Sequence, residues 1–136
     1  MTLILTSLLL TVCGVFFLST GVMSFLRPVA FGKSLSLAPV GASGIVEIRA
    51  QYGGFFFAAA LSQFAPFVGL IASTTAFIVA AIIFGGLILG RIGAAMAKPD
   101  NEALSPMIKA LYLIDGVGFL ASIGALLALS VHGANL

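Results

Sequence analysis

The feature that most constrains the fold of this chain is a long run without charged side chains near its beginning, from Leu3 to Leu26. A helix needs about 20 apolar residues to cross the hydrocarbon core of a bilayer. A cleaved signal peptide would have basic residues before a shorter apolar run, whereas here Arg27 follows the run and no Lys or Arg precedes it. We therefore expect a retained transmembrane helix over residues 3–26.

The composition extends this interpretation to the whole chain. Of the 136 residues, 61% are hydrophobic and only 7% are charged, and the mean hydropathy is +1.26, which lies far outside the usage of soluble domains. The apolar runs are unbroken and lack the alternation of a membrane β-barrel. We predict an all-α integral membrane protein with a single transmembrane domain over residues 1–136.

Three further spans are expected after a connector that contains Pro, Gly and Ser. The predicted spans cover residues 44–65, 74–97 and 106–131. Ser43 is expected to cap the second helix, Pro66 to end it, and Ser105 with Pro106 to begin the fourth. The polar stretch 98–102 is predicted to be a short loop, and the spacing of Gly86 and Gly90 favours close helix packing. The connector is equally compatible with a short interfacial turn and with a loose loop. Together the spans predict a four-helix bundle.

The basic residues decide the expected orientation. All six fall on the side of the membrane shared by the first and third connections: Arg27, Lys33, Arg49, Arg91, Lys98 and Lys109. Short loops rich in Lys and Arg stay in the cytoplasm. We therefore expect two cytoplasmic connections and both termini outside.

Two charged residues lie deep enough in the predicted spans to be inside the hydrocarbon core. At 1.5 Å per helical residue, Arg91 lies roughly 9 Å from the end of the third span and Asp115 roughly 13 Å into the fourth. Insertion of such a residue at the bilayer centre costs about 2.5–3.5 kcal/mol, so charged residues in membranes are usually paired. We predict an ion pair between Arg91 and Asp115.

The second span presents two polar faces. The face that carries Glu47 continues with Gln51, Gly54 and Ala58, whereas the face that carries Arg49 continues with Tyr52 and Phe56. Glu47, which lies beside small residues, is expected to face the bundle and meet Arg91. Arg49 is expected to extend to the lipid boundary.

These residues define a candidate intramembrane cluster with Tyr112, which stands one turn before Asp115. The cluster contains Glu47, Arg49, Tyr52, Arg91, Tyr112 and Asp115. One interpretation is a proton or anion pathway, or a pocket for a head group or small polar molecule. The other, which we favour from the sequence, is a set of ion pairs that holds the helices together.

No residues specify a reaction, so the sequence assigns no catalytic group and favours a role other than an enzyme. His132 stands alone beyond the last span, so no metal site is expected. The spread of the basic residues between apolar segments argues against nucleic acid as a partner. The sequence identifies no cofactor.

The stretch Glu47-Ile48-Arg49-Ala50-Gln51-Tyr52-Gly53-Gly54, together with Gly90-Arg91, resembles a family of small bacterial four-helix membrane proteins. The family is called domain of unknown function 4345 and is distantly similar to DoxX-type bundles. The resemblance implies a compact four-helix bundle in a bacterial inner (cytoplasmic) membrane and no established activity. It also implies that Glu47, Arg49, Tyr52 and Arg91 occupy the motif positions of the family.

Two functions follow as hypotheses. The first is an accessory or structural subunit that packs against a larger membrane complex, with a membrane protein or a second copy as its partner. The alternative is a small transporter or a binding pocket for a lipid, quinone or other small amphiphile, with the intramembrane cluster as its polar end. The sequence decides neither the ligand nor the oligomeric state.

Overall fold

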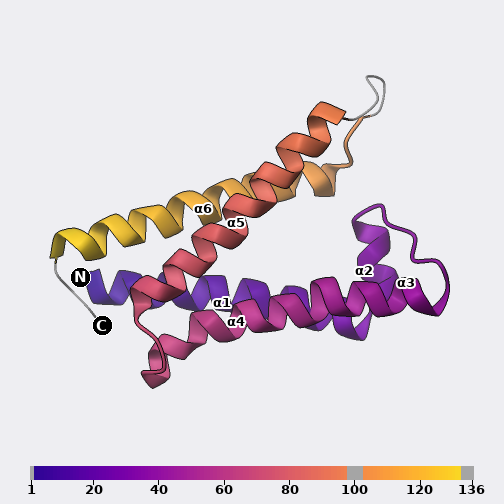
Figure 1. Ribbon diagram of the computed structural model, residues 1–136. Helices are drawn as coiled ribbons and strands as arrows, with labels where there is room; N and C mark the ends of the chain where they lie inside the picture. The colour runs from indigo at the N-terminus through magenta and orange to yellow at the C-terminus, as the bar shows by residue number, and fades with distance from the viewer. Residues whose placement is uncertain (1, 98–102, 133–136) are drawn as a thin grey trace.

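The computed structural model describes residues 2–97 and 103–132, and every regular element in these ranges is helical (Figure 1). The elements are α1 (Thr2–Leu26), α2 (Pro28–Ser34), α3 (Gly41–Ile48), η1 (Arg49–Gly54), α4 (Phe55–Phe64), η2 (Ala65–Val68), α5 (Ser73–Ala97) and α6 (Pro106–His132). The loop expected at residues 98–102 lies outside the described residues. The prediction of an all-α chain is confirmed for the part that the structure describes.

Three helices are long and apolar enough to cross a membrane: α1, α5 and α6. Their bounds agree with the expected spans 3–26, 74–97 and 106–131 to within one residue at each end. The hydroxyl of Ser105 accepts a hydrogen bond from the backbone amide of Ile108 at 3.3 Å, which is the expected N-cap of α6. These helices indicate a membrane-embedded protein.

The second predicted span differs from the expected continuous α-helix. The helix begins at Gly41, so Ser43 lies within α3 and does not cap it. The six residues of η1 form a π-helix between α3 and α4, and η2 is a 3₁₀ turn that contains Pro66. Gly69 then adopts a left-handed backbone with φ of 72°, which reverses the chain toward α5.

A close backbone approach explains why the π-helical segment contains glycine. A Cβ atom on Gly53 would lie 3.1 Å from the ring of Phe25, and one on Gly21 would lie 3.2 Å from the carbonyl oxygen of Gly53. Helix α1 therefore packs tightly against η1 and α4 at this crossing.

The helices form two antiparallel pairs, α1 with α4 and α5 with α6 (Figure 1). The pairs contact each other through a buried core in which the ring centroids of Phe17 and Phe84 are 5.2 Å apart and those of Phe17 and Phe56 are 5.7 Å apart. A second buried cluster, which includes Leu10 and Phe77, packs between the pairs nearer the chain termini. Toward the end that carries α2 the pairs diverge, as Figure 1 shows.

Reciprocal contacts between glycine and phenylalanine hold α5 against α6. A Cβ atom on Gly118 would lie 2.6 Å from the ring of Phe84, and one on Gly85 would lie 3.2 Å from the ring of Phe119. The glycines expected to serve this purpose, Gly86 and Gly90, have nothing within 4 Å of the corresponding position. The prediction that this spacing marks the packing surface was wrong, because these two glycines face an open space.

Candidate ligand-binding pocket

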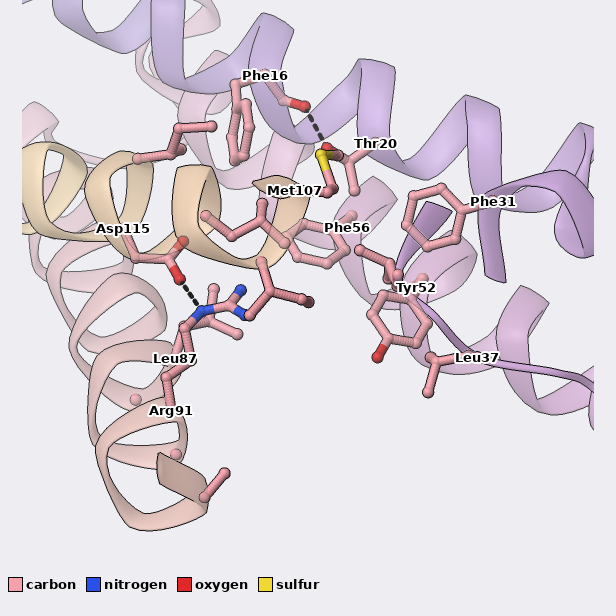
Figure 2. A pocket seen from close by; sticks show the side chains of 17 residues that line it. Phe16, Thr20, Phe31, Leu37, Tyr52, Phe56, Leu87, Arg91, Met107 and Asp115 are labelled. Atoms are coloured by element: carbon pink, nitrogen blue, oxygen red, sulfur yellow. Dashed lines mark hydrogen bonds and ion pairs between the residues drawn. The ribbon is translucent and has the colours of Figure 1, made fainter. Parts of the chain in front are cut away.

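The open space between the diverging helix pairs is a pocket of about 460 Å³ (Figure 2). Helices α5 and α6 supply one wall, and α1, α2, η1 and α4 supply the other. The lining residues are Phe16, Thr20, Phe31, Leu35, Leu37, Tyr52, Phe56, Gly86, Leu87, Gly90, Arg91, Ala94, Met107, Ile108, Leu111, Ile114 and Asp115. Most of them are apolar, and the few polar groups come from separate elements.

The polar end of the pocket is the ion pair of Arg91 and Asp115. The Nε atom of Arg91 donates to Oδ2 of Asp115 at 2.6 Å, which confirms the pair expected from their depths. The side chain of Asp115 is 1% exposed and that of Arg91 is 20% exposed. The carboxylate is therefore removed from the surface, whereas the guanidinium reaches an accessible part of the pocket.

Tyr112 fixes the position of Arg91 from outside the lining. Its hydroxyl donates to the backbone carbonyl of Arg91 at 2.8 Å, and its ring centroid lies 5.8 Å from Cζ of the guanidinium. This hydrogen bond joins α6 to α5, and Tyr112 lies three residues before Asp115 on α6. Two successive contacts from one helix thus hold the backbone and the side chain of Arg91.

The opposite wall is aromatic. Figure 2 shows Phe16, Phe31, Tyr52 and Phe56 on the side of the pocket that faces Arg91. The ring centroids of Phe31 and Tyr52 are 5.3 Å apart, so α2 contacts η1 on this side of the pocket. The hydroxyl of Thr20 donates a hydrogen bond to the carbonyl of Phe16 at 2.9 Å, so the hydroxyl proton is already used within α1. This wall offers ring surfaces and little polarity.

Gly86 and Gly90 lie on the α5 wall, on the same side of the helix as Arg91. Because neither has a neighbour within 4 Å of a would-be Cβ atom, a larger side chain at either position would extend into free volume. Gly93 has the same open surroundings but does not line the pocket. The two lining glycines create part of the cavity.

Glu47 differs from its expected position. It is exposed and does not line the pocket, and the other residues of its face, Gln51, Gly54 and Ala58, are exposed as well. The face that packs inward carries Ile48, Tyr52 and Phe56. The residues predicted to share a face do share one, but this face points outward, because α1 and the pocket contact the opposite face that carries Tyr52 and Phe56.

Arg49 has a structural role at the end of α1. Its Nε atom donates to the carbonyl of Phe25 at 3.1 Å, and its Cζ atom lies 5.7 Å from the ring centroid of Phe25. Carbonyls in the last turn of a helix have no partner within the helix, so this contact satisfies one of them. Of the six residues in the predicted cluster, the structure brings Tyr52, Arg91 and Asp115 to the pocket and Tyr112 behind Arg91.

The apolar residues of the connector were not predicted to belong to a site. Helix α2 forms here, and Phe31, Leu35 and Leu37 line the pocket. The spacing of Phe31 and Leu35 by four residues is a signal of a helix with one apolar face. Phe and Leu residues with this spacing are equally typical of a helix face that contacts lipid, so the sequence pattern alone does not identify a pocket.

A large buried polar side chain, that of Gln63, lies away from this pocket. Gln63 on α4 donates from Nε2 to the carbonyl of Ala76 at 3.1 Å and to the hydroxyl of Ser62 at 3.0 Å. Its Oε1 atom is buried and has no hydrogen-bond partner among the described residues. The amide joins α4 to α5 near the turn between them, which suits a packing role.

Comparisons of the chain with protein-family models, with curated proteins and with solved structures gave no match.

Proposed function

We propose that this protein binds a small amphiphile, such as a lipid or quinone, within the membrane in the pocket between its helix pairs. The observation that carries the proposal is a largely apolar cavity of about 460 Å³ with a single ion pair at its polar end. Sites for small molecules are typically about 300–1,000 Å³, mainly apolar, with a few polar groups that fix orientation. The pocket has this design.

The two walls would bind different parts of the amphiphile. The aromatic and aliphatic side chains, among them Phe16, Phe56 and Leu111, suit an acyl or prenyl tail and a ring. The N–H groups of Arg91 suit a head group that accepts hydrogen bonds, since a guanidinium has five donors and no acceptor. The proposed activity is binding and delivery of the amphiphile, with no chemical step at the protein.

The proposal includes a membrane context. The protein is a four-helix bundle of a bacterial inner membrane, in which the composite segment from Gly41 to Val68 acts as the second span and both termini lie outside. The excess of basic residues at the α2 end supports this orientation. The motif residues Glu47, Arg49, Tyr52 and Arg91 support membership of the family called domain of unknown function 4345.

A matched pair of glycine variants tests the pocket. Purification in nanodiscs followed by mass spectrometry of bound small molecules is expected to find a defined amphiphile with the wild-type protein. Gly86→Leu would fill the cavity and lose this molecule, whereas Gly93→Leu, on the same helix but outside the lining, would retain it. Equal retention by both variants would contradict the proposal.

An accessory-subunit role is a second candidate, supported by the exposed ring of Phe55 and the open surface at Gly93. Both features suit a neighbouring helix as well as lipid. Under this alternative, Phe55→Ala loses a stoichiometric protein partner in native extraction, and the pocket variant Gly86→Leu loses it only if the partner enters the cavity. A wild-type preparation with no partner protein would contradict it.

A further inference from the structure

We infer that the pocket selects amphiphiles with an uncharged head that accepts hydrogen bonds, above all a carbonyl group, over amphiphiles with a carboxylate head. The inference rests on the proposed function and specifies its ligand class. It follows from the charges and the hydrogen-bond donors at the polar end of the pocket.

The charge of the polar end is already balanced. Among the described residues, Arg91 and Asp115 are the charged members of the lining, and their polar atoms are 2.6 Å apart. Asp115 is 1% exposed, so its charge is compensated by Arg91 and not by water. A carboxylate head would be a third charge without a partner in an apolar cavity, where an uncompensated ion is strongly disfavoured. A cationic head would meet the same difficulty.

The polar end nevertheless has donors to offer. Asp115 engages the Nε atom of Arg91, and the guanidinium makes no other hydrogen bond to a described side chain. In Figure 2 its terminal nitrogens extend across the pocket in the direction of Phe56 and Tyr52. The hydroxyl of Tyr52 likewise has no hydrogen-bond partner among the described residues. An uncharged carbonyl oxygen can accept from these groups without adding a charge.

The other basic residues that the structure describes do not alter this balance. Arg27, Lys33, Arg49 and Lys109 are exposed at the same end of the molecule and lie outside the lining. An anion attracted to them stays at the surface, in contact with water. Inside the pocket it would meet only the guanidinium that Asp115 already neutralises.

Two probes with the same acyl chain test the inference on the wild-type protein. Monoolein has an uncharged ester head, and oleate has a carboxylate, which is ionised at about pH 9. Each probe is titrated directly into the protein in nanodiscs, and the dissociation constant is expected to be at least about tenfold lower for monoolein. Equal affinity, or tighter binding of oleate, would overturn the inference.

A charge-changing variant provides a second measurement. Asp115→Asn keeps the shape of the side chain and leaves Arg91 with an uncompensated charge, so the preference is expected to reverse toward oleate. Glu47→Gln removes a carboxylate outside the pocket and is expected to keep the wild-type preference. An unchanged preference in a folded Asp115→Asn protein would overturn the inference; if that variant does not fold, the wild-type comparison decides alone.

The outcomes separate this inference from the proposed function. A wild-type protein that binds neither probe and carries no amphiphile contradicts the function itself, whereas one that binds oleate better contradicts only the head-group assignment. A short-tail ubiquinone in a parallel arm distinguishes the source of the carbonyl. If the quinone binds more tightly than monoolein, the native head is a ring that stacks on the aromatic wall. If it binds more weakly, the native head is an acyl ester. Both results support the inference, provided that oleate binds most weakly of the three probes.

Discussion

Arg91 is the residue on which the pocket depends, because α6 holds both its side chain and its backbone carbonyl. Asp115 accepts from Nε, and the hydroxyl of Tyr112 donates to the carbonyl oxygen. A buried ion pair contributes little net stability relative to apolar residues, but removal of one partner leaves the other charge uncompensated. The pair can therefore act as a clip between α5 and α6 and also present donors to a ligand.

A double-mutant cycle at this pair separates the two roles. Arg91→Leu alone is expected to lower the free energy of unfolding by about 3–5 kcal/mol because Asp115 stays buried without a partner. The double variant Arg91→Leu, Asp115→Leu is expected to recover most of this loss while failing to bind the amphiphile. Unfolding in mixed detergent micelles measures the first effect, and mass spectrometry measures the second. Strictly additive losses of stability, or retained binding in the double variant, would contradict this account.

At the scale of helices, each glycine in α5 and α6 has a role set by its neighbour. Gly118 admits the ring of Phe84, which is itself buried against Phe17 and has little room to move. Gly116, two residues earlier on α6, has nothing within 4 Å of a would-be Cβ atom. The two positions form a natural comparison.

Gly118→Ala is expected to destabilise the protein by about 1–3 kcal/mol, because the new methyl group forces Phe84 out of its position. Gly116→Ala is expected to leave stability unchanged or raise it by up to about 1 kcal/mol, since alanine favours the helical backbone. Thermal unfolding of the two variants in the same detergent measures the difference. A similar midpoint for both would show that α5 and α6 do not pack through this contact.

For the whole molecule, the pairs α1–α4 and α5–α6 meet in one core and separate toward α2. The core rings fill the space where the pairs cross, and the pocket begins where they diverge (Figures 1 and 2). The polar end of the pocket and the excess of exposed basic residues therefore lie in the same half of the molecule. A ligand head would enter at the level of the cytoplasmic head groups in the proposed orientation.

Reporter fusions test this orientation. Alkaline phosphatase is active only outside the cytoplasm, and we expect activity when it is fused after Leu136 and none when it is inserted in the connection between α5 and α6. A green fluorescent protein fused at the same two positions is expected to give the opposite pattern. The reverse result would place the basic residues outside, contrary to the positive-inside rule.

The sequence alone determined the helical class, the three long apolar helices and the pairing of Arg91 with Asp115. These features depend on local properties: run length, capping residues such as Ser105, and the cost of an isolated charge in an apolar span. They are encoded by neighbouring residues or by a requirement that any arrangement must meet.

Only the tertiary structure decided which residues form the pocket. Glu47 shares a face with Gln51 and Ala58 as predicted, but that face is exposed, and α1 approaches Gly53 closely on the side that carries Tyr52 and Phe56. Gly86 and Gly118 are the same residue type, but Gly86 faces the cavity and Gly118 faces the ring of Phe84. In a membrane protein an apolar residue suits lipid, core and ligand equally well, so only the angle between the helix pairs distinguishes these environments.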